Sequence, residues 1–337
     1  SSQNAIPSQR PGFMRQPPYQ GGFTLAVADV FEDFTKRDWQ KEGPDDQPAR
    51  IAVVGNGWFS REHAIPAFEK SDFWELGIGV DPVEENRQQV QNHFNIPALT
   101  PDQLHRGEKS EHYDALYIAT PNCFHLEYVK TGVKLDKHIL CEKPMEKNYQ
   151  RSKTLVETMN DSDVELMIGY RMHFEPAVRR MRDIVNEKFI GEIELIHSSV
   201  SQQLLTIDED PEQWRLDREL SGGGAMVNIG LYPLNTIRFV LGEDPIGIQA
   251  TMRSDHSAFD EVEEKVSFQL EFENGTLACC SAQETAHRAS HLTLIAERGQ
   301  MELKPAYAPW RPLTLTVETK NDRINYECTG KSVNGAI

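Results

Sequence analysis

Short apolar runs alternate with longer amphipathic segments between residues 50 and 170. The runs have the length of buried strands and occupy residues 51–54, 76–80, 115–119, 138–141 and 166–169. The segments that separate them have the length of helices and occupy residues 63–70, 82–93, 124–134 and 149–159. Repeated strand–helix units of this length predict a parallel, doubly wound α/β sheet.

The pattern changes beyond about residue 190. One helix is expected at 228–241, and the other elements are strand-like, at 193–203, 246–252, 265–273, 275–283, 291–296, 299–303 and 313–319. Asn274-Gly275 separates two of these strands and predicts a hairpin. This half therefore indicates an α+β domain with a large open, mostly antiparallel sheet.

Residues 1–49 precede the first clear strand and are expected to form an N-terminal arm. Apolar residues at helical spacing predict a short helix within 23–39. The first twenty residues lack the apolar centre of a secretory signal, and no run approaches the roughly 18–20 apolar residues of a membrane helix. We expect a cytoplasmic protein on these grounds.

Acidic residues outnumber basic ones by 52 to 35, which gives a formal net charge of −17. Nucleic acids and anionic membranes would be repelled by such a chain, so neither is an expected partner. The acids are dispersed along the sequence, which fits either a surface adapted to high salt, the favoured interpretation, or ordinary acidic solubility. The five cysteines show no zinc-type spacing, so we expect buried thiols and no metal site.

A glycine motif follows the first strand of the N-terminal half. Gly55 and Gly57 permit a tight turn and close approach of a pyrophosphate to the start of a helix, with Trp58 and Phe59 in the same turn. Asp81 ends the second strand, where a carboxylate can bind a ribose 2′-hydroxyl. Asp81 therefore favours NAD, whereas Arg87 nearby could offset its charge toward NADP.

Two further motifs stand at the ends of the next strands. Thr120-Pro121-Asn122, with His125, follows the third strand, and Glu142-Lys143-Pro144 follows the fourth. Ligands of open α/β sheets bind outside the carboxyl ends of the strands, so both motifs are expected on one crevice. The alternative for Lys143 is an ordinary surface charge.

Together these motifs resemble those of the Gfo/Idh/MocA oxidoreductase family. Gly169-Tyr170-Arg171, Gln213-Trp214-Arg215, Gly222-Gly223-Gly224 and Asn228-Ile229-Gly230-Leu231-Tyr232 extend the similarity over residues 50–320, and the Trp-Arg and triple-glycine segments resemble the glucose–fructose oxidoreductase branch. The resemblance implies an N-terminal dinucleotide-binding Rossmann domain at 50–170. It implies a substrate-binding and oligomerisation domain at 171–337, with the open sheet as the interface of a homodimer or homotetramer.

The resemblance also implies site residues. It makes Tyr232 the proton-transfer residue, supported by Lys143, and it allows a cis peptide before Pro144. Cofactor contacts are expected from Gly55, Gly57, Trp58, Phe59, Asp81, Arg87, Thr120, Asn122, His125, Glu142, Lys143, Arg171, Trp214 and Arg215. Substrate contacts are expected from Lys143, Arg171, His173, Asn228 and Tyr232, although Arg171 and His173 could instead pair with acids at the domain junction.

Asn228 departs from many relatives, which carry Asp there. An amide hydrogen-bonds a sugar hydroxyl but takes no proton, which leaves Tyr232 as the acid/base. A phenol with a pKa of about 10 is a poor base at neutral pH, and a neighbouring ammonium favours its phenolate form. The alternative for Tyr232 is a core tyrosine, and for the triple glycine a flexible loop.

The expected reaction is hydride transfer from C1 of an aldose to NAD(P), giving the aldonolactone. The resemblance favours D-xylose as the sugar and NADP as the cofactor, with NAD possible. Oxidation of another sugar or polyol, such as glucose or inositol, is the alternative within enzymes. A non-catalytic NAD(P)-binding sensor is the alternative outside them.

In the related branch the arm packs near the cofactor of a neighbouring subunit, which we favour here over disorder because Phe23, Phe31, Phe34 and Trp39 are costly to expose.

Overall fold

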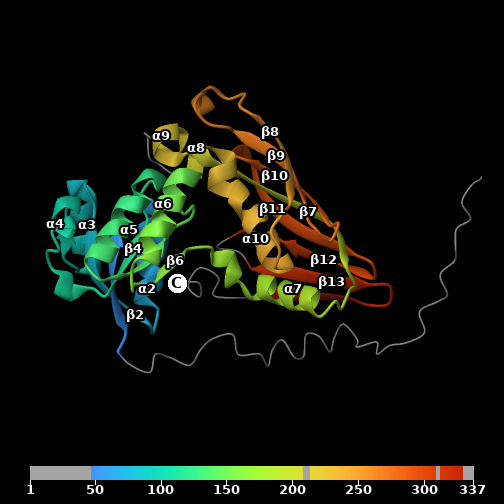
Figure 1. The fold of residues 1–337 in the computed structure, drawn as a ribbon, viewed down its shortest axis with the longest axis horizontal. Helices are drawn as coiled ribbons and strands as arrows, with labels where there is room; N and C mark the ends of the chain where they lie inside the picture. The colour runs from blue at the N-terminus through green and yellow to red at the C-terminus, as the bar shows by residue number, and fades with distance from the viewer. Residues whose placement is uncertain (1–46, 208–212, 309–311, 329–337) are drawn as a thin grey trace, which may run out of the picture.

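The chain folds around two β-sheets that lie side by side, each with its own helices (Figure 1). The structure is a computed structural model that describes residues 47–207, 213–308 and 312–328. The expected helix at 23–39 and nearly all of the arm lie outside the described residues. No helix of the described part is long and apolar enough to span a membrane.

The first sheet has six parallel strands in the order β3-β2-β1-β4-β5-β6. They are β1 (Ala49–Val54), β2 (Trp74–Val80), β3 (Ala98–Leu99), β4 (Ala115–Ile118), β5 (His138–Cys141) and β6 (Leu166–Ile168). The predicted doubly wound sheet is confirmed. Strand β3 was not predicted because two residues carry no readable periodicity.

Helices cover both faces of this sheet, and they are α2 (Ile65–Glu69), α3 (Glu84–Phe94), α4 (Pro101–His105), α5 (His125–Lys134) and α6 (Tyr149–Asn160). Strand β1 is apolar without alternation because both of its faces are buried. Ile51 and Val53 pack into one hydrophobic cluster, and Ala52 and Val54 pack into another on the opposite face. All four side chains are buried, as expected for a parallel strand between two helical layers.

The second sheet has eight strands in the order β14-β13-β12-β11-β7-β10-β9-β8. They are β7 (Ile193–Gln203), β8 (Gly247–Arg253), β9 (Lys265–Glu271), β10 (Leu277–Gln283), β11 (Thr285–Ala296), β12 (Gly299–Lys304), β13 (Leu313–Thr319) and β14 (Arg323–Cys328). Apart from the parallel pair of β7 and β10, the neighbouring strands described here are antiparallel, which confirms the expected sheet. The Asn274-Gly275 turn joins β9 to β10 as predicted.

Two elements of this half differ from the expectation. Strand β14 lies in a stretch without clear apolar alternation, where a loop was expected, and it forms because it pairs along the whole of β13. Helix α7 (Pro176–Asn186) was also not predicted. Val178, Met181 and Ile184 have helical spacing and are fully buried, so an amphipathic pattern within 176–186 was the signal that could have found it.

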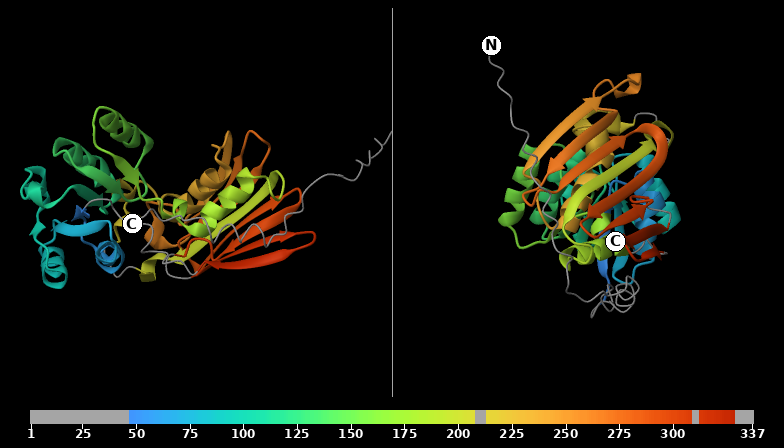
Figure 2. Two further views of the ribbon diagram at one scale, coloured as in Figure 1. Left: turned by 90° about the horizontal axis from the view of Figure 1, so that it is seen from below. Right: turned by 90° about the vertical axis from the view of Figure 1, so that its right-hand side faces the viewer.

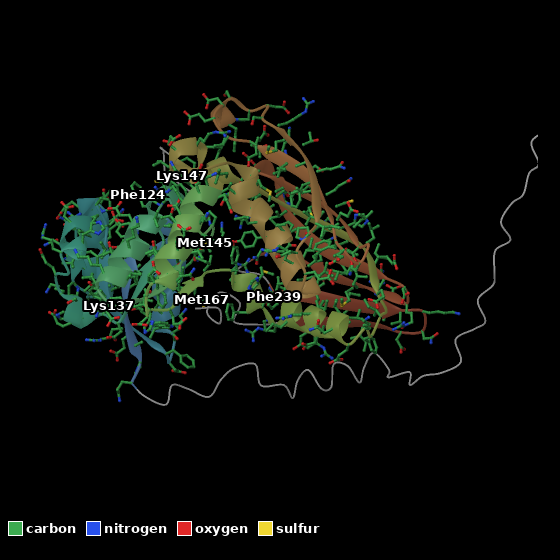
Figure 3. The ribbon with its side chains drawn as sticks, viewed as in Figure 1. Phe124, Lys137, Met145, Lys147, Met167 and Phe239 are labelled. Carbon is green, nitrogen blue, oxygen red and sulfur yellow. The ribbon has the colours of Figure 1, made fainter. Side chains whose placement is uncertain are left out.

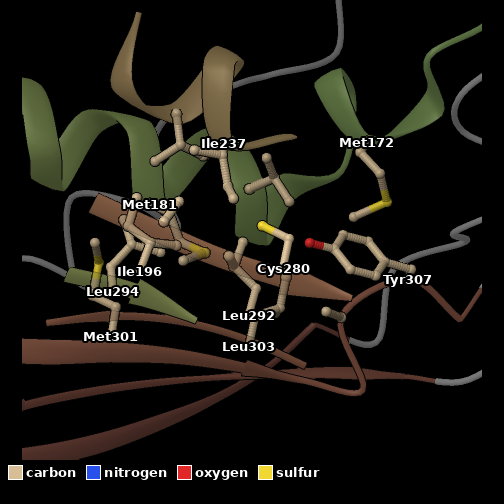
Figure 4. Packing of buried hydrophobic residues seen from close by; sticks show 14 of the residues in the cluster. Met172, Met181, Ile196, Ile237, Cys280, Leu292, Leu294, Met301, Leu303 and Tyr307 are labelled. Atoms are coloured by element: carbon tan, nitrogen blue, oxygen red, sulfur yellow. The ribbon is translucent and has the colours of Figure 1, made fainter. Parts of the chain in front are cut away.

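Helices α7 and α10 (Leu231–Leu241) cover one face of the large sheet and leave the other face open (Figure 2). Their side chains and the inner residues of the strands form one hydrophobic cluster (Figure 4). Tyr307 enters this cluster from the loop after β12, and its hydroxyl is hydrogen-bonded to Ser198 at 2.7 Å. The covered face of the large sheet is therefore the one turned toward the first sheet.

Candidate active site

One cavity of about 1250 Å³ lies between the two sheets. Its wall on the side of the first sheet comes from the loops after β1, β2, β4 and β5, which are the carboxyl ends of parallel strands, as expected for this fold. Its wall on the side of the second sheet comes from β7, the start of α10 and the loop after β12. Phe124 and Met167, labelled in Figure 3, line it from the first side.

The glycine turn after β1 fits a dinucleotide. Gly55 has a φ of +91°, and a Cβ there would lie 2.5 Å from the carbonyl oxygen of Ala119, so only glycine is tolerated. A Cβ on Gly57 would meet no atom within 4 Å, which leaves open space beside the backbone at the start of the following helical segment. That space is where a pyrophosphate would lie against the helix N-terminus.

Asp81 lines the same end of the cavity, but its carboxylate is occupied by the protein. It accepts hydrogen bonds from the backbone nitrogens of Asn56 (2.7 Å) and Val83 (2.8 Å) and from Nδ2 of Asn86 (3.2 Å). Arg87 is not in the cavity wall, because its guanidinium turns back to the carbonyl oxygens of Asp81 and Pro82. Arg61, in contrast to Arg87, does line the wall.

The Thr120 motif divides between the wall and the support behind it. Thr120 and Asn122 line the cavity, and Nδ2 of Asn122 donates to the carbonyl oxygen of Ser221 at 2.7 Å, which ties the first sheet to the glycine segment. His125 is fully buried behind the wall, with its ring nitrogens 3.0 Å and 3.1 Å from the carbonyl oxygens of Pro144 and Thr120. It supports the motif without facing the cavity.

The triple glycine is tightly packed, contrary to the flexible loop considered from the sequence. A Cβ on Gly222 would lie 2.0 Å from the carbonyl oxygen of Lys147, and one on Gly224 would lie equally close to that of Glu263. Side chains are therefore excluded at both positions, and the segment fixes how the first sheet meets the start of α10. Arg215 and Trp214, which precede it, both line the cavity.

Lys143 reaches from the first sheet to the second. The peptide between Lys143 and Pro144 is cis, as the resemblance implied, and Nζ donates to the backbone oxygen of Asn228 at 2.7 Å. Behind it, the buried Glu142 carboxyl accepts from the Tyr117 hydroxyl at 2.7 Å and from the Lys143 backbone nitrogen at 3.2 Å. Burial raises the pKa of Glu142, while these hydrogen bonds lower it in part.

Tyr232 lies where two cations converge. Nζ of Lys143 and the guanidinium carbon of Arg171 each lie 5.4 Å from the centre of its ring, and Tyr307 stacks on it at 5.8 Å. All three are contacts of the ring, and the Tyr232 hydroxyl has no hydrogen bond within the described part of the chain. The hydroxyl of Tyr307 is bonded to Ser198 instead, so Tyr232 is the phenol available to a ligand.

The sequence left Arg171 and His173 open between binding substrate and packing at the domain junction, and the structure places them differently. Arg171 lines the cavity, donates to the carbonyl oxygen of Tyr307, and keeps Nη1 buried without a partner among the described residues. His173 does not reach the wall, because its ring stacks at 4.3 Å on Phe239 of α10, labelled in Figure 3, and on Tyr170. His173 thus packs at the domain junction.

Three residues near the site were missed from the sequence. Arg61 follows Ser60 directly, so its place in the first helical turn of the glycine motif was the signal that could have found it. Gln202 lines the cavity at the end of β7, and Glu284 lies behind it between β10 and β11. Neither belongs to a motif, and no local pattern marks them.

Comparison with known proteins agrees with this geometry. Residues 49–170 match the family described as "Oxidoreductase family, NAD-binding Rossmann fold", and residues 178–302 match "GFO/IDH/MocA C-terminal domain". Together the two matches cover most of the chain. They coincide with the two sheets described above.

Among curated proteins, the chain is 42% identical over 299 residues to a D-xylose 1-dehydrogenase [NADP(+)] of Haloarcula marismortui, covering 87% of this chain and 83% of that protein. It is 26% identical over 265 residues to D-xylose 1-dehydrogenase (NADP(+)) 2 of Haloferax volcanii, covering 76% of each. Among solved structures, an aldose–aldose oxidoreductase from Caulobacter crescentus complexed with glycerol superposes with a TM-score of 0.79 at 24% identity, covering 86% of this chain and 87% of that one. That structural likeness shows a shared fold.

The buried His125 predicts a pH dependence of stability. Burial lowers its pKa below the usual 6.5, so the unfolded chain takes up a proton as pH falls through 6.5 while the folded protein does not. Stability is therefore retained above pH 6.5 and lost below it. We expect the difference in unfolding free energy between pH 8 and pH 5.5 to be smaller by about 1 kcal/mol in His125→Gln than in the unchanged protein.

Urea unfolding at the two pH values measures this difference. The exposed His93 provides the control, since His93→Gln is expected to leave the pH dependence unchanged. Equal pH dependence in His125→Gln and the unchanged protein would contradict the assignment.

Proposed function

The chain belongs to the Gfo/Idh/MocA oxidoreductase family, and we propose that it oxidises the C1 hydroxyl of an aldose, D-xylose being favoured, with NADP as acceptor. The observation that carries the proposal is the convergence of Lys143 and Arg171 on the ring of Tyr232 inside the cavity that the glycine turn borders. The 42% identity to the Haloarcula enzyme supports the choice of sugar.

Tyr232 acts as the general base in this proposal. Its hydroxyl has no competing partner among the described residues, and the charged groups of Lys143 and Arg171 each lie 5.4 Å from the centre of its ring. Lys143 is itself held by the carbonyl oxygen of Asn228, which fixes its ammonium beside the ring. The cavity therefore holds a preorganised acceptor for a hydroxyl proton.

The reaction then balances in one step. The bound nicotinamide supplies the chemistry of hydride acceptance from C1. Tyr232 takes the proton of the C1 hydroxyl as the carbonyl of the aldonolactone forms. The positive charges of Lys143 and Arg171 lie beside the ring of Tyr232 during this transfer. Asn228 and Arg171 bind sugar hydroxyls from the wall of the second sheet.

The cofactor is held mainly by the wall of the first sheet. The residues proposed to contact it are Gly55, Gly57, Trp58, Phe59, Arg61, Asp81, Thr120, Asn122, Glu142 and Lys143, together with Arg171, Trp214 and Arg215, which lie beyond β6. Arg87 and His125 leave the set of direct contacts because their side chains bond elsewhere.

The environment of Asp81 weakens its preference for NAD. Three hydrogen-bond donors already engage its carboxylate, so it has fewer free positions for a ribose 2′-hydroxyl, the contact that would favour NAD. Arg61 uses Nη1 for the oxygens of Asn56 and Asn86, and its Nη2 has no partner among the described residues. A 2′-phosphate is the ligand chemistry that a free guanidinium edge in this place favours.

A sensor without turnover is the weaker proposal. Binding of NAD(P) requires neither a phenol kept free of hydrogen bonds nor two cations placed over it. Placing two partly buried cations over one ring is costly. A negative charge that develops there during the reaction would explain their placement.

Tyr232→Phe tests the base. We expect the turnover number with D-xylose to fall by about 10²- to 10⁴-fold because the proton acceptor is lost, while the dissociation constant of NADP stays within about twofold. Steady-state kinetics and fluorescence titration of NADPH measure the two quantities. Tyr149→Phe changes an exposed tyrosine in the same way and should leave both unchanged; unchanged turnover in Tyr232→Phe would reject the mechanism.

Arg61→Gln tests the cofactor preference. Loss of a charge-assisted hydrogen bond to a 2′-phosphate is expected to lower kcat/KM for NADP by about 10- to 100-fold. The value for NAD should change by less than about threefold, because NAD has no phosphate there. Arg87→Gln is the matched control and should not alter the NADP/NAD ratio; a parallel loss for both cofactors in Arg61→Gln would contradict the assignment.

We also propose that the open face of the large sheet is a subunit interface. Leu277, Leu195 and Ile295 lie opposite one another across β10, β7 and β11 on that face, where an apolar row is costly to leave in water. Leu277 is 50% exposed and Ile295 36%.

Leu277→Glu tests the interface. Placing charges opposite each other in a self-associating face is expected to shift the native mass, measured by light scattering, toward that of the monomer. Phe73→Glu alters a comparably exposed apolar residue just before β2 of the first sheet and should leave the mass unchanged. A native mass unaltered by Leu277→Glu would place the interface elsewhere.

A further inference from the structure

A buried carboxyl group lies directly behind the sugar side of the cavity. Glu284 connects β10 to β11, is fully buried, and is absent from the cavity wall among the described residues. Its two oxygens accept hydrogen bonds of 2.8 Å each, one from Nδ2 of Asn228 and one from Nε2 of Gln202. Both of these amide side chains do line the wall.

The carboxylate determines which way the two amides face. An ionised carboxylate only accepts hydrogen bonds, so each amide must turn its nitrogen toward Glu284 and its oxygen away. Burial raises the pKa of Glu284, whereas the two amides and the nearby charges of Lys143 and Arg215 favour its ionised form. Without such an anchor, an amide presents nitrogen or oxygen with similar ease.

The outward oxygens are available to a ligand. Neither Oδ1 of Asn228 nor Oε1 of Gln202 has a hydrogen-bond partner among the described residues, and neither atom is buried. Asn228 precedes Tyr232 by four residues in a helical segment, so the two side chains share one face. The side chain of Asn228 therefore lies on the same helical face as the proposed base.

We propose that Glu284 is a positioning residue that makes Gln202 and Asn228 a pair of hydrogen-bond acceptors, so that the site selects substrates by the hydroxyl protons they donate. The proposal rests on the function proposed above and adds the basis of its selectivity. Hydroxyl groups adjacent to the reacting carbon donate hydrogen bonds to the outward amide oxygens of Gln202 and Asn228. Analogues that lack one of these hydroxyls leave an acceptor that the bound sugar covers without a partner, which disfavours them.

Glu284→Gln is the informative change. The new amide has one oxygen and one nitrogen, so it satisfies only one neighbour in the original orientation, and either Gln202 or Asn228 must turn its nitrogen toward the cavity. The volume and burial of the side chain are kept. The altered property is the donor and acceptor pattern that the sugar meets.

Binding to the NADPH-loaded protein measures the effect without turnover. Calorimetry gives the dissociation constants of D-xylose and of its 2-, 3- and 4-monodeoxy analogues. For Glu284→Gln we expect D-xylose to bind about 3- to 10-fold more weakly, the size of one lost hydrogen bond. We also expect the preference for D-xylose over at least one deoxy analogue to fall by a similar factor, with NADPH affinity unchanged.

Two comparisons separate positioning from general damage. Glu146 is also buried, accepts from the backbone nitrogens of Leu126 (3.3 Å) and Lys147 (2.6 Å) in the first domain and is absent from the cavity wall among the described residues, so Glu146→Gln should keep the sugar preferences. In a Gln202→Ala, Asn228→Ala background, Glu284→Gln should have no further effect on them. Wild-type preferences in Glu284→Gln, or an undiminished effect in the double-alanine background, would overturn the proposal.

A second measurement does not depend on the sugar. Side-chain amide protons of Gln202 and Asn228, identified in NMR spectra by their loss in the alanine variants, should exchange slowly in the wild type and one pair should exchange faster in Glu284→Gln. If D-xylose and its analogues fail to bind, the proposed function is wrong, and this exchange pattern alone supports the role of Glu284. Fast exchange of both amides in the wild type overturns it.

Discussion

The hydrogen bond from Lys143 to the backbone of Asn228 is the contact on which the site depends. It links residues 85 positions apart, one at the carboxyl end of β5 and the other at the start of the segment that leads into α10. Because the acceptor is a backbone oxygen, the position of the ammonium is set by the path of the chain. Any side chain at position 228 would leave that acceptor in place.

The surroundings of this contact hold it from both sides. Asn122 bonds to the backbone of Ser221, and the backbone at Gly222 and Gly224 packs closely against the carbonyl oxygens of Lys147 and Glu263. Two carboxyl groups of the site are likewise hydrogen-bonded, Glu142 to Tyr117 and Glu284 to two amides. Buried polar networks of this kind, when satisfied, specify one arrangement.

The two sheets present different chemical groups to the cavity. The first offers backbone space at Gly57 and a cation at Arg61, which suit a phosphate-bearing cofactor. The second offers amide oxygens, a phenol and Arg171, which suit a polyhydroxylated ligand. Tyr232 and Lys143 meet at the boundary, so a proton acceptor lies where the two kinds of ligand would touch.

The sequence alone indicated the principal strands and helices of the first domain and the open sheet of the second, because apolar periodicity is a local signal, whereas the pairing of Lys143 with Tyr232 was implied by the family resemblance. Strand β14 escaped it, since it forms by pairing with β13, and helix α7 was missed although its apolar residues have helical spacing. Tertiary structure decided which polar residues face the cavity: Arg87, His125 and His173 turn to nearer partners, whereas Arg61 and Gln202 line the wall and Glu284 lies behind it. A side chain's direction is the outcome of competition among neighbours that become neighbours only on folding, and a linear pattern does not contain them.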